Sequence, residues 1–223
     1  MSSKTKKLII ASLIMNLSNF VIVTVCIILN IIGISDDYVA GIKTFKFFTN
    51  NSNMFSAAVS VAIAICDILI LIGKRKDINY IVLLFKEMTT VCVTITLLIV
   101  VCVLGPVEGY YNFIILDKGM CLHVVCPLLT IISYLVCEYS FRKKQNIFIY
   151  SLFALIPVII YGVFYITLVI GAGLWDNFYG LNTNGMIAFS CSFMVVLAYL
   201  VSLGLSFAHR KIEKKNLYSE VTA

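Results

Sequence analysis

INYIVLLFKEMTTVCVTITLLIVVCVL, residues Ile78–Leu104, is the most informative segment of the chain. Lys86 and Glu87 are its only charged residues, and it exceeds the roughly 20 apolar residues that a helix needs to cross a bilayer core. Unpaired backbone groups find no hydrogen-bond partner in lipid, so such a segment crosses a membrane as a helix. The segment therefore predicts a transmembrane helix.

Five further stretches have the same apolar character, which makes six expected transmembrane helices. They are Leu8–Ile34, Phe55–Gly73, Ile78–Leu104, Cys121–Phe141, Ile147–Ile170 and Met186–Ala208. The first stretch follows three lysines, as in a signal peptide, but it is longer than the usual ~7–15 residues and no small-residue cleavage site follows it. We therefore expect it to be retained as the first helix.

The composition of the whole chain supports a membrane protein. Of its 223 residues, 61% are apolar and 13% are charged, and the mean hydropathy is +1.02. Soluble domains carry about a quarter charged residues. This composition excludes a soluble enzyme, a nucleic-acid-binding module and a disordered protein. With no visible linker, residues 1–223 are expected to form a single all-α domain, a polytopic bundle of six transmembrane helices.

The distribution of positive charge predicts the orientation of the helices. Thirteen of the 17 Lys and Arg residues fall in the N-terminus, the loops after the second and fourth stretches, and the C-terminus. Only Lys43, Lys46 and Lys118 fall on the opposite side. Under the positive-inside rule both termini are cytoplasmic, and the chain is a multi-pass protein of the cell membrane. The net charge of +6 then needs no nucleic-acid partner.

Cysteine spacing gives no sign of a metal centre. The eight cysteines lie within apolar stretches or at the edge of one, and the sequence has no CxxC motif or Cys/His cluster. We expect no metal and no cofactor.

Charged residues within the expected helices point to polar contacts between helices. Lys86 and Glu87 lie nine or more residues past the preceding basic loop, nearer to the middle of the membrane. An isolated charge at that depth costs a few kcal/mol or more. We expect both to find partners on neighbouring helices, with Asp67 as a candidate partner of Lys86. Two interpretations remain open: a structural ion-pair network, and direct participation in a binding or catalytic site.

Thr49 and His123 are candidates for acid–base chemistry near the outer side. His209 lies in a basic cytoplasmic segment, which leaves His123 as the histidine available there. A neutral imidazole can accept the proton of a threonine hydroxyl during nucleophilic attack. Asn50 and Asn53, close to Thr49, can donate hydrogen bonds to a developing oxyanion. The alternative is that His123 is a hydrogen-bonded structural residue.

Two short stretches resemble a known family. FKFFTNNSNM (Phe45–Met54) and HVVCPL (His123–Leu128) resemble the androgen-induced hydrolase family, which includes the androgen-dependent TFPI-regulating protein, and its bacterial multi-pass relatives. Lys86-Glu87 is similar to a basic–acidic pair of that family, and Gly173-Leu174-Trp175 is similar to its GxW motif. The polar run from Asn50 to Asn53 is closer to the bacterial branch than to the animal proteins.

The resemblance implies an intramembrane threonine hydrolase that cleaves lipid esters, such as fatty acid esters of hydroxy fatty acids. It implies Thr49 as the nucleophile and His123 as its base. The expected substrate-binding residues are Asn50, Asn53, Lys86, Glu87 and Trp175. The alternative is a non-catalytic membrane protein: a lipid-binding protein, a scaffold, or a small-solute transporter that uses Lys86 and Glu87 as a coupling pair.

Overall fold

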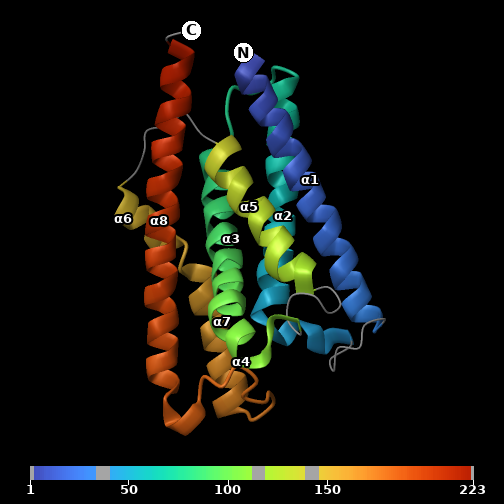
Figure 1. Ribbon diagram of the computed structural model, residues 1–223, viewed down its shortest axis with the longest axis vertical. Coiled ribbons are helices and arrows are strands. Elements are labelled where there is room, and N and C mark those ends of the chain that lie inside the picture. Colours follow the sequence, from blue (N-terminus) through green and yellow to red (C-terminus); the bar gives the residue numbers. More distant parts are fainter. Residues whose placement is uncertain (1–2, 34–40, 112–118, 139–145, 222–223) are drawn as a thin grey trace.

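A computed structural model describes residues 3–33, 41–111, 119–138 and 146–221, and every regular element in these ranges is helical (Figure 1). Five of the helices are long and apolar enough to cross a membrane, and a shorter apolar helix covers Cys121–Cys137. The prediction of an all-α protein with apolar helices is therefore confirmed.

Each expected apolar stretch corresponds to a helix or to consecutive helical segments. These are α1 (Ser3–Ile32), α2 (Phe48–Leu71), α3 (Tyr80–Ile99) with η2 (Val100–Leu104) and α4 (Gly105–Glu108), η4 (Cys121–Val125) with α5 (Cys126–Ile132) and η5 (Ser133–Cys137), α6 (Ile147–Phe153), α7 (Ile156–Ile166) with η6 (Thr167–Gly171), and α8 (Ile187–Val221). Two short 3-10 helices, η1 (Gly41–Lys46) and η7 (Thr183–Gly185), lie in the connections.

The second helix begins at Phe48, earlier than the apolar pattern suggests, so that Thr49 lies in its first turn. The asparagines after Thr49 explain the difference. The Asn50 amide donates to the Thr44 carbonyl at 2.9 Å, and the Asn51 amide donates to the Phe45 carbonyl at 2.6 Å. These bonds dock the start of α2 onto η1 and make a polar run compatible with a helix.

The fifth apolar stretch is broken between α6 and α7 at Ala154 and Leu155. Pro157 lies in the first turn of α7, where its missing N–H is tolerated. Further inside a continuous helix the same ring would clash with the carbonyl of Phe153. The break therefore has a local cause in the sequence.

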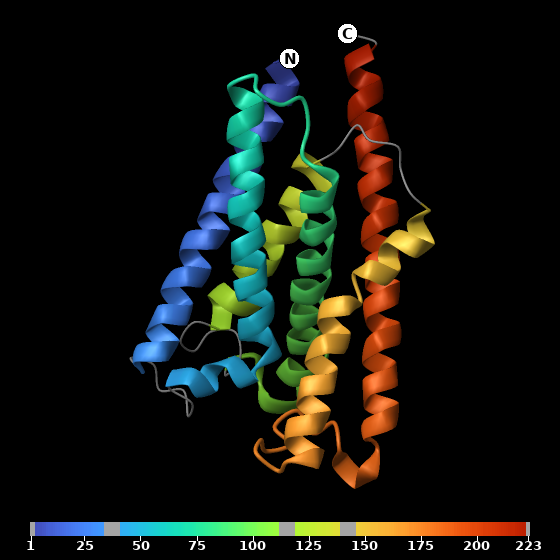
Figure 2. The same cartoon turned by 180° about the vertical axis from the view of Figure 1, so that it is seen from behind.

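The helices form a bundle whose inner part is built by α1, α2, α3 and α5. α1 packs along α2, α2 packs along α3, and α5 contacts both α1 and α3 (Figures 1 and 2). α8 packs against α3, α6 and η5. The start of α1 and the end of α8 lie at the same end of the bundle (Figure 1).

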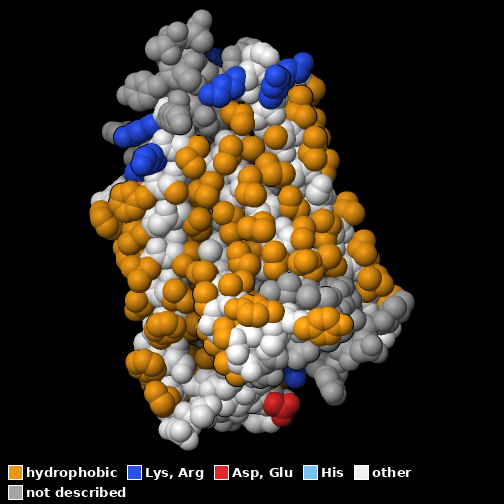
Figure 3. All heavy atoms as spheres, viewed as in Figure 1, with side chains coloured by type: hydrophobic (Ala, Val, Ile, Leu, Met, Phe, Trp, Pro, Cys, Tyr) orange, Lys and Arg blue, Asp and Glu red, His pale blue; other side chains and the backbone are white. Residues whose placement is uncertain are grey.

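The surface is apolar around the middle of the bundle and charged at its ends (Figure 3). Large hydrophobic side chains such as Ile14, Val21, Val163 and Phe189 are more than half exposed. Lys and Arg gather at the end that holds the termini (Figure 3). Monomeric soluble proteins rarely expose apolar patches beyond a few hundred Å². The surface is therefore compatible with a membrane protein.

Candidate functional site

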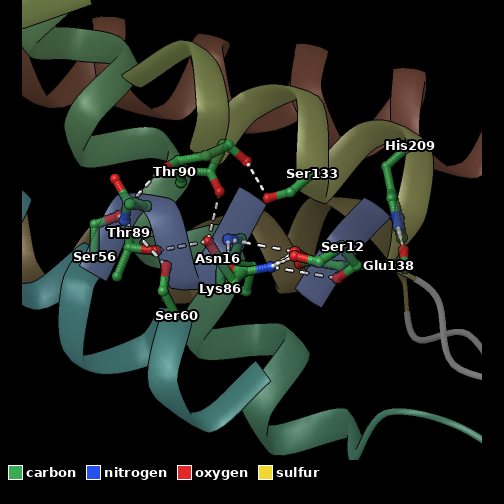
Figure 4. Close-up of polar contacts among 12 residues, drawn as sticks. Ser12, Asn16, Ser56, Ser60, Lys86, Thr89, Thr90, Ser133, Glu138 and His209 are labelled. Atoms are coloured by element: carbon green, nitrogen blue, oxygen red, sulfur yellow. Dashed lines mark hydrogen bonds and ion pairs between the residues drawn. The ribbon is translucent and has the colours of Figure 1, made fainter. Parts of the chain in front are cut away.

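A buried polar cluster joins α1, α3 and the residue after η5 (Figure 4). Lys86 Nζ lies 3.3 Å from Glu138 Oε1, and both side chains are at most 1% exposed. Lys86 also donates to Asn16 Oδ1 at 2.6 Å, while Asn16 Nδ2 donates to Glu138 Oε1 at 2.9 Å. One asparagine amide thus binds both members of the ion pair. The prediction that Lys86 has a partner on a neighbouring helix is confirmed.

Asp67 of α2 is the second carboxyl of this cluster. It is 1% exposed, hydrogen-bonds the Ser12 side chain, and interacts electrostatically with both Lys86 and Glu138. Ser12 Oγ also accepts a hydrogen bond from Asn16 Nδ2 at 3.3 Å. The direct partner of Lys86 is therefore Glu138, and Asp67 is a second, less direct neighbour.

Glu87 faces a different set of residues from Lys86. It accepts hydrogen bonds from the hydroxyl groups of Tyr134 (3.0 Å), Ser202 (2.9 Å) and Ser206 (2.5 Å), and it also hydrogen-bonds Tyr150. Successive residues of a helix point about 100° apart, which separates the two side chains. Lys86 and Glu87 are thus neighbours in sequence that belong to different clusters.

Thr49 lies in the wall of a largely apolar cavity of about 330 Å³. The cavity is formed by the start of α2, by α3, α7 and α8, and by the connection after η6. Near Thr49 the wall includes Phe48, Thr96, Tyr161 and Tyr179. A threonine hydroxyl beside an apolar cavity can meet a polar group of a bound hydrocarbon ligand.

Tyr179 fixes the start of α2 and is a residue that the sequence did not single out for a role at this site. Its hydroxyl oxygen accepts a hydrogen bond from the Phe48 N–H at 2.8 Å and also interacts with the Thr49 backbone. Burial raises the pKa of Tyr179 to about 12, so its hydroxyl is neutral at pH 7. The only sequence signal for this contact is an aromatic residue in an outer loop.

His123 lies in η4, and its Nδ1 is buried without a hydrogen-bond partner in the part of the chain that the structure describes. It lines neither of the two described cavities. Asn53 connects its surroundings to Thr49, because Asn53 Nδ2 donates to the Thr49 carbonyl (2.8 Å) and to the Leu122 carbonyl (3.0 Å). The turns that carry Thr49 and His123 are joined, whereas no hydrogen bond between the two side chains occurs among the described contacts.

The remaining candidate residues lie around these features. The Asn50 and Asn53 amides both donate to carbonyl groups of the protein itself. Trp175 lines a second largely apolar cavity, of about 720 Å³. The two cavities share Phe48 and Tyr161, whose rings lie 5.0 Å apart. Thr49 and Trp175 therefore line two different cavities that share one aromatic pair.

Comparison of the chain with protein-family models, with curated proteins and with solved structures finds no match.

Proposed function

We propose that this protein is a membrane-embedded hydrolase of lipid esters, with Thr49 as the nucleophile and His123 as the general base. The observation that carries the proposal is the position of Thr49 in the wall of a largely apolar cavity. An acyl chain would occupy the cavity and bring its ester carbonyl to the Thr49 hydroxyl. Attack by Thr49 Oγ1 would form an acyl-enzyme, with the proton passing to His123 and then to the departing alkoxide.

Two further observations support this proposal. Thr49 lies in the first turn of α2, where the helix dipole favours the negative charge that develops on an oxyanion. The His123 Nδ1 has no partner among the described residues, and Asn53 holds the turn before His123 against the Thr49 turn. In the proposal, ligand binding brings the two side chains together, since catalytic hydrogen bonds are often long in unliganded enzymes.

In the full proposal the chain crosses the cell membrane six times with both termini in the cytoplasm. The supporting features are the five long apolar helices, the shorter helix Cys121–Cys137 and the basic residues beside the termini. Thr49 and His123 then lie toward the outer leaflet, where a bilayer lipid can reach the cavity.

The test is ester hydrolysis by the purified protein in nanodiscs. The panel contains simple fatty acyl esters and fatty acid esters of hydroxy fatty acids. We expect turnover that is lost in Thr49→Ala and in His123→Ala while the melting temperature is kept. Thr94→Ala is the matched control, because the hydrogen bond described for Thr94 goes to the Thr90 carbonyl of its own helix and Thr94 does not line the cavity. Turnover that survives in Thr49→Ala contradicts the assignment of the nucleophile.

The second candidate function is non-catalytic lipid binding. It is favoured by the absence of His123 from the lining of the described cavity beside Thr49, and by the internal hydrogen bonds of Asn50 and Asn53. A folded wild-type protein that binds fatty acyl esters without hydrolysing any of them, and binds them equally in Thr49→Ala, supports this candidate over the hydrolase.

A further inference from the structure

The polar cluster around Lys86 contains more acid than base. Asp67 and Glu138 both interact with the single ammonium group of Lys86, and all three residues are 1% exposed. The contacts that α1 adds, from Ser12 and Asn16, are uncharged. With all three groups ionised, the cluster would hold a net negative charge inside an apolar bundle.

The two carboxyls are not equally well satisfied. Glu138 Oε1 receives both Lys86 and the Asn16 amide, which is the geometry of a charged carboxylate, although Glu138 Oε2 is buried without a partner among the described residues. Asp67 has one uncharged partner, the Ser12 hydroxyl, and its Oδ2 is buried without any partner among the described residues. A buried carboxylate with a single uncharged partner is unfavourable, and such a group tends to become neutral instead.

Among the contacts described for the Asp67 carboxyl, Lys86 is the cation and no second one appears. Cys137 can add only negative charge. On α8, the His209 Nε2 lies 2.6 Å from the backbone oxygen of Glu138, and the ring stacks on Tyr134. Arg210 acts on Tyr80 and Tyr150, which belong to the surroundings of Glu87.

We propose that Asp67, Lys86 and Glu138 form a proton-binding site, in which Lys86 and Glu138 are the charged pair and Asp67 carries one proton. The cluster is then neutral overall, and the hydroxyl of the Asp67 carboxylic acid replaces an unpaired anionic oxygen. Asp67 lies one turn before the end of α2, at the end of the bundle that holds the termini, so aqueous solution there is the source of the proton. None of the three residues lines either described cavity, contrary to the expected substrate-binding role of Lys86, so the site is independent of the hydrolase proposed at Thr49.

The test is infrared spectroscopy of the protein in nanodiscs at pH 7, which detects the carbonyl stretch of protonated carboxyl groups. We expect a band that shifts in D2O and loses intensity in Asp67→Asn. Glu138→Gln should cause an equal loss, because Asp67 then becomes the counterion of Lys86 and ionises. Lys86→Met should increase the intensity, because Glu138 loses its cation and takes up a proton, which gives the cluster two protonated carboxyl groups.

Glu87→Gln is the matched control, since Glu87 is a buried carboxyl held by hydroxyl groups outside the cluster. The loss caused by Glu138→Gln should persist in a Glu87→Gln background. A wild-type protein without the band overturns the proposal and does not depend on the folding of any variant. A band that keeps its full intensity in Asp67→Asn also overturns it.

Discussion

Lys86 connects several segments in the interior of this bundle. Its ammonium group binds Glu138 and Asn16, and the Asn16 amide in turn binds Glu138. Three segments, α1, α3 and the end of η5, therefore meet at one charge. Removing one member of a buried ion pair usually destabilises a protein by about 3–5 kcal/mol, because the remaining group is left as an unpaired charge or is forced to become neutral.

We predict that Lys86→Met lowers the free energy of unfolding by about 3–5 kcal/mol. The double variant Lys86→Met/Glu138→Leu should recover most of this loss, because no buried charge of the pair then remains. The measurement is reversible unfolding in detergent micelles, completed as a double-mutant cycle with Glu138→Leu. If the loss of free energy of unfolding in the double variant equals the sum of the losses in the two single variants, the two side chains are not energetically coupled.

The sequence could predict that Lys86 needs a partner but could not identify it. The sequence suggested Asp67, whereas the direct partner is Glu138. The choice depends on Asn16, whose amide orients the Glu138 carboxylate toward Lys86. That contact joins residues far apart in the chain, and no local pattern encodes it.

At the scale of the element, the start of α2 depends on a residue from a distant loop. The Phe48 N–H has no partner within the helix, and no side chain caps it from Phe47. Tyr179 supplies the missing acceptor at 2.8 Å. The sequence predicted the candidate nucleophile, Thr49, from a short polar motif, but it could not predict the tyrosine that holds its turn in place.

We predict that Tyr179→Phe loosens the first turn of α2, because the Phe48 N–H loses its acceptor at a cost of about 1 kcal/mol. Hydrogen–deuterium exchange at the amides of residues 48 and 49 should become about fivefold faster, the fold-change that corresponds to this energy. Tyr110→Phe is the control, because the Tyr110 hydroxyl binds the Val101 carbonyl outside α2. Unchanged exchange in Tyr179→Phe would contradict this role.

The docking of α8 rests on a polar contact as well as on apolar packing. Ser202 and Ser206 lie one turn apart and both donate to Glu87 Oε1 of α3. We predict that Ser202→Ala/Ser206→Ala lowers the free energy of unfolding by about 2–4 kcal/mol, since Glu87 loses two hydroxyl donors inside the bundle. The melting temperature in detergent checks this, with the exposed Ser192→Ala as control. A melting temperature equal to that of the control contradicts the prediction.

At the scale of the whole molecule, the apolar stretches predicted where the helices lie but not how they pack. Apolar length is a property of one segment, whereas packing depends on which polar side chains meet between segments. α5 illustrates this, because Thr130 Oγ1 of α5 lies 3.0 Å from Ser56 Oγ of α2. This contact helps to set how α5 packs on α2, which the apolar residues of α5 do not specify. The early start of α2 and the break before α7 likewise reflect Asn50, Asn51 and Pro157 rather than hydrophobicity.

The arrangement of charge at the two ends of the bundle leads to a prediction about topology. The start of α1, the end of α8 and the loop after α2, which holds Lys74, lie at one end, while the loop that holds Asp176 lies at the other (Figure 2). The positive-inside rule places the first end in the cytoplasm. In intact cells a membrane-impermeant maleimide should label Asp176→Cys, and it should label Lys74→Cys only after permeabilisation. Wild-type protein provides the background from its own cysteines. Labelling of Lys74→Cys alone in intact cells would reverse the orientation, and would place Thr49 and His123 toward the cytoplasmic leaflet.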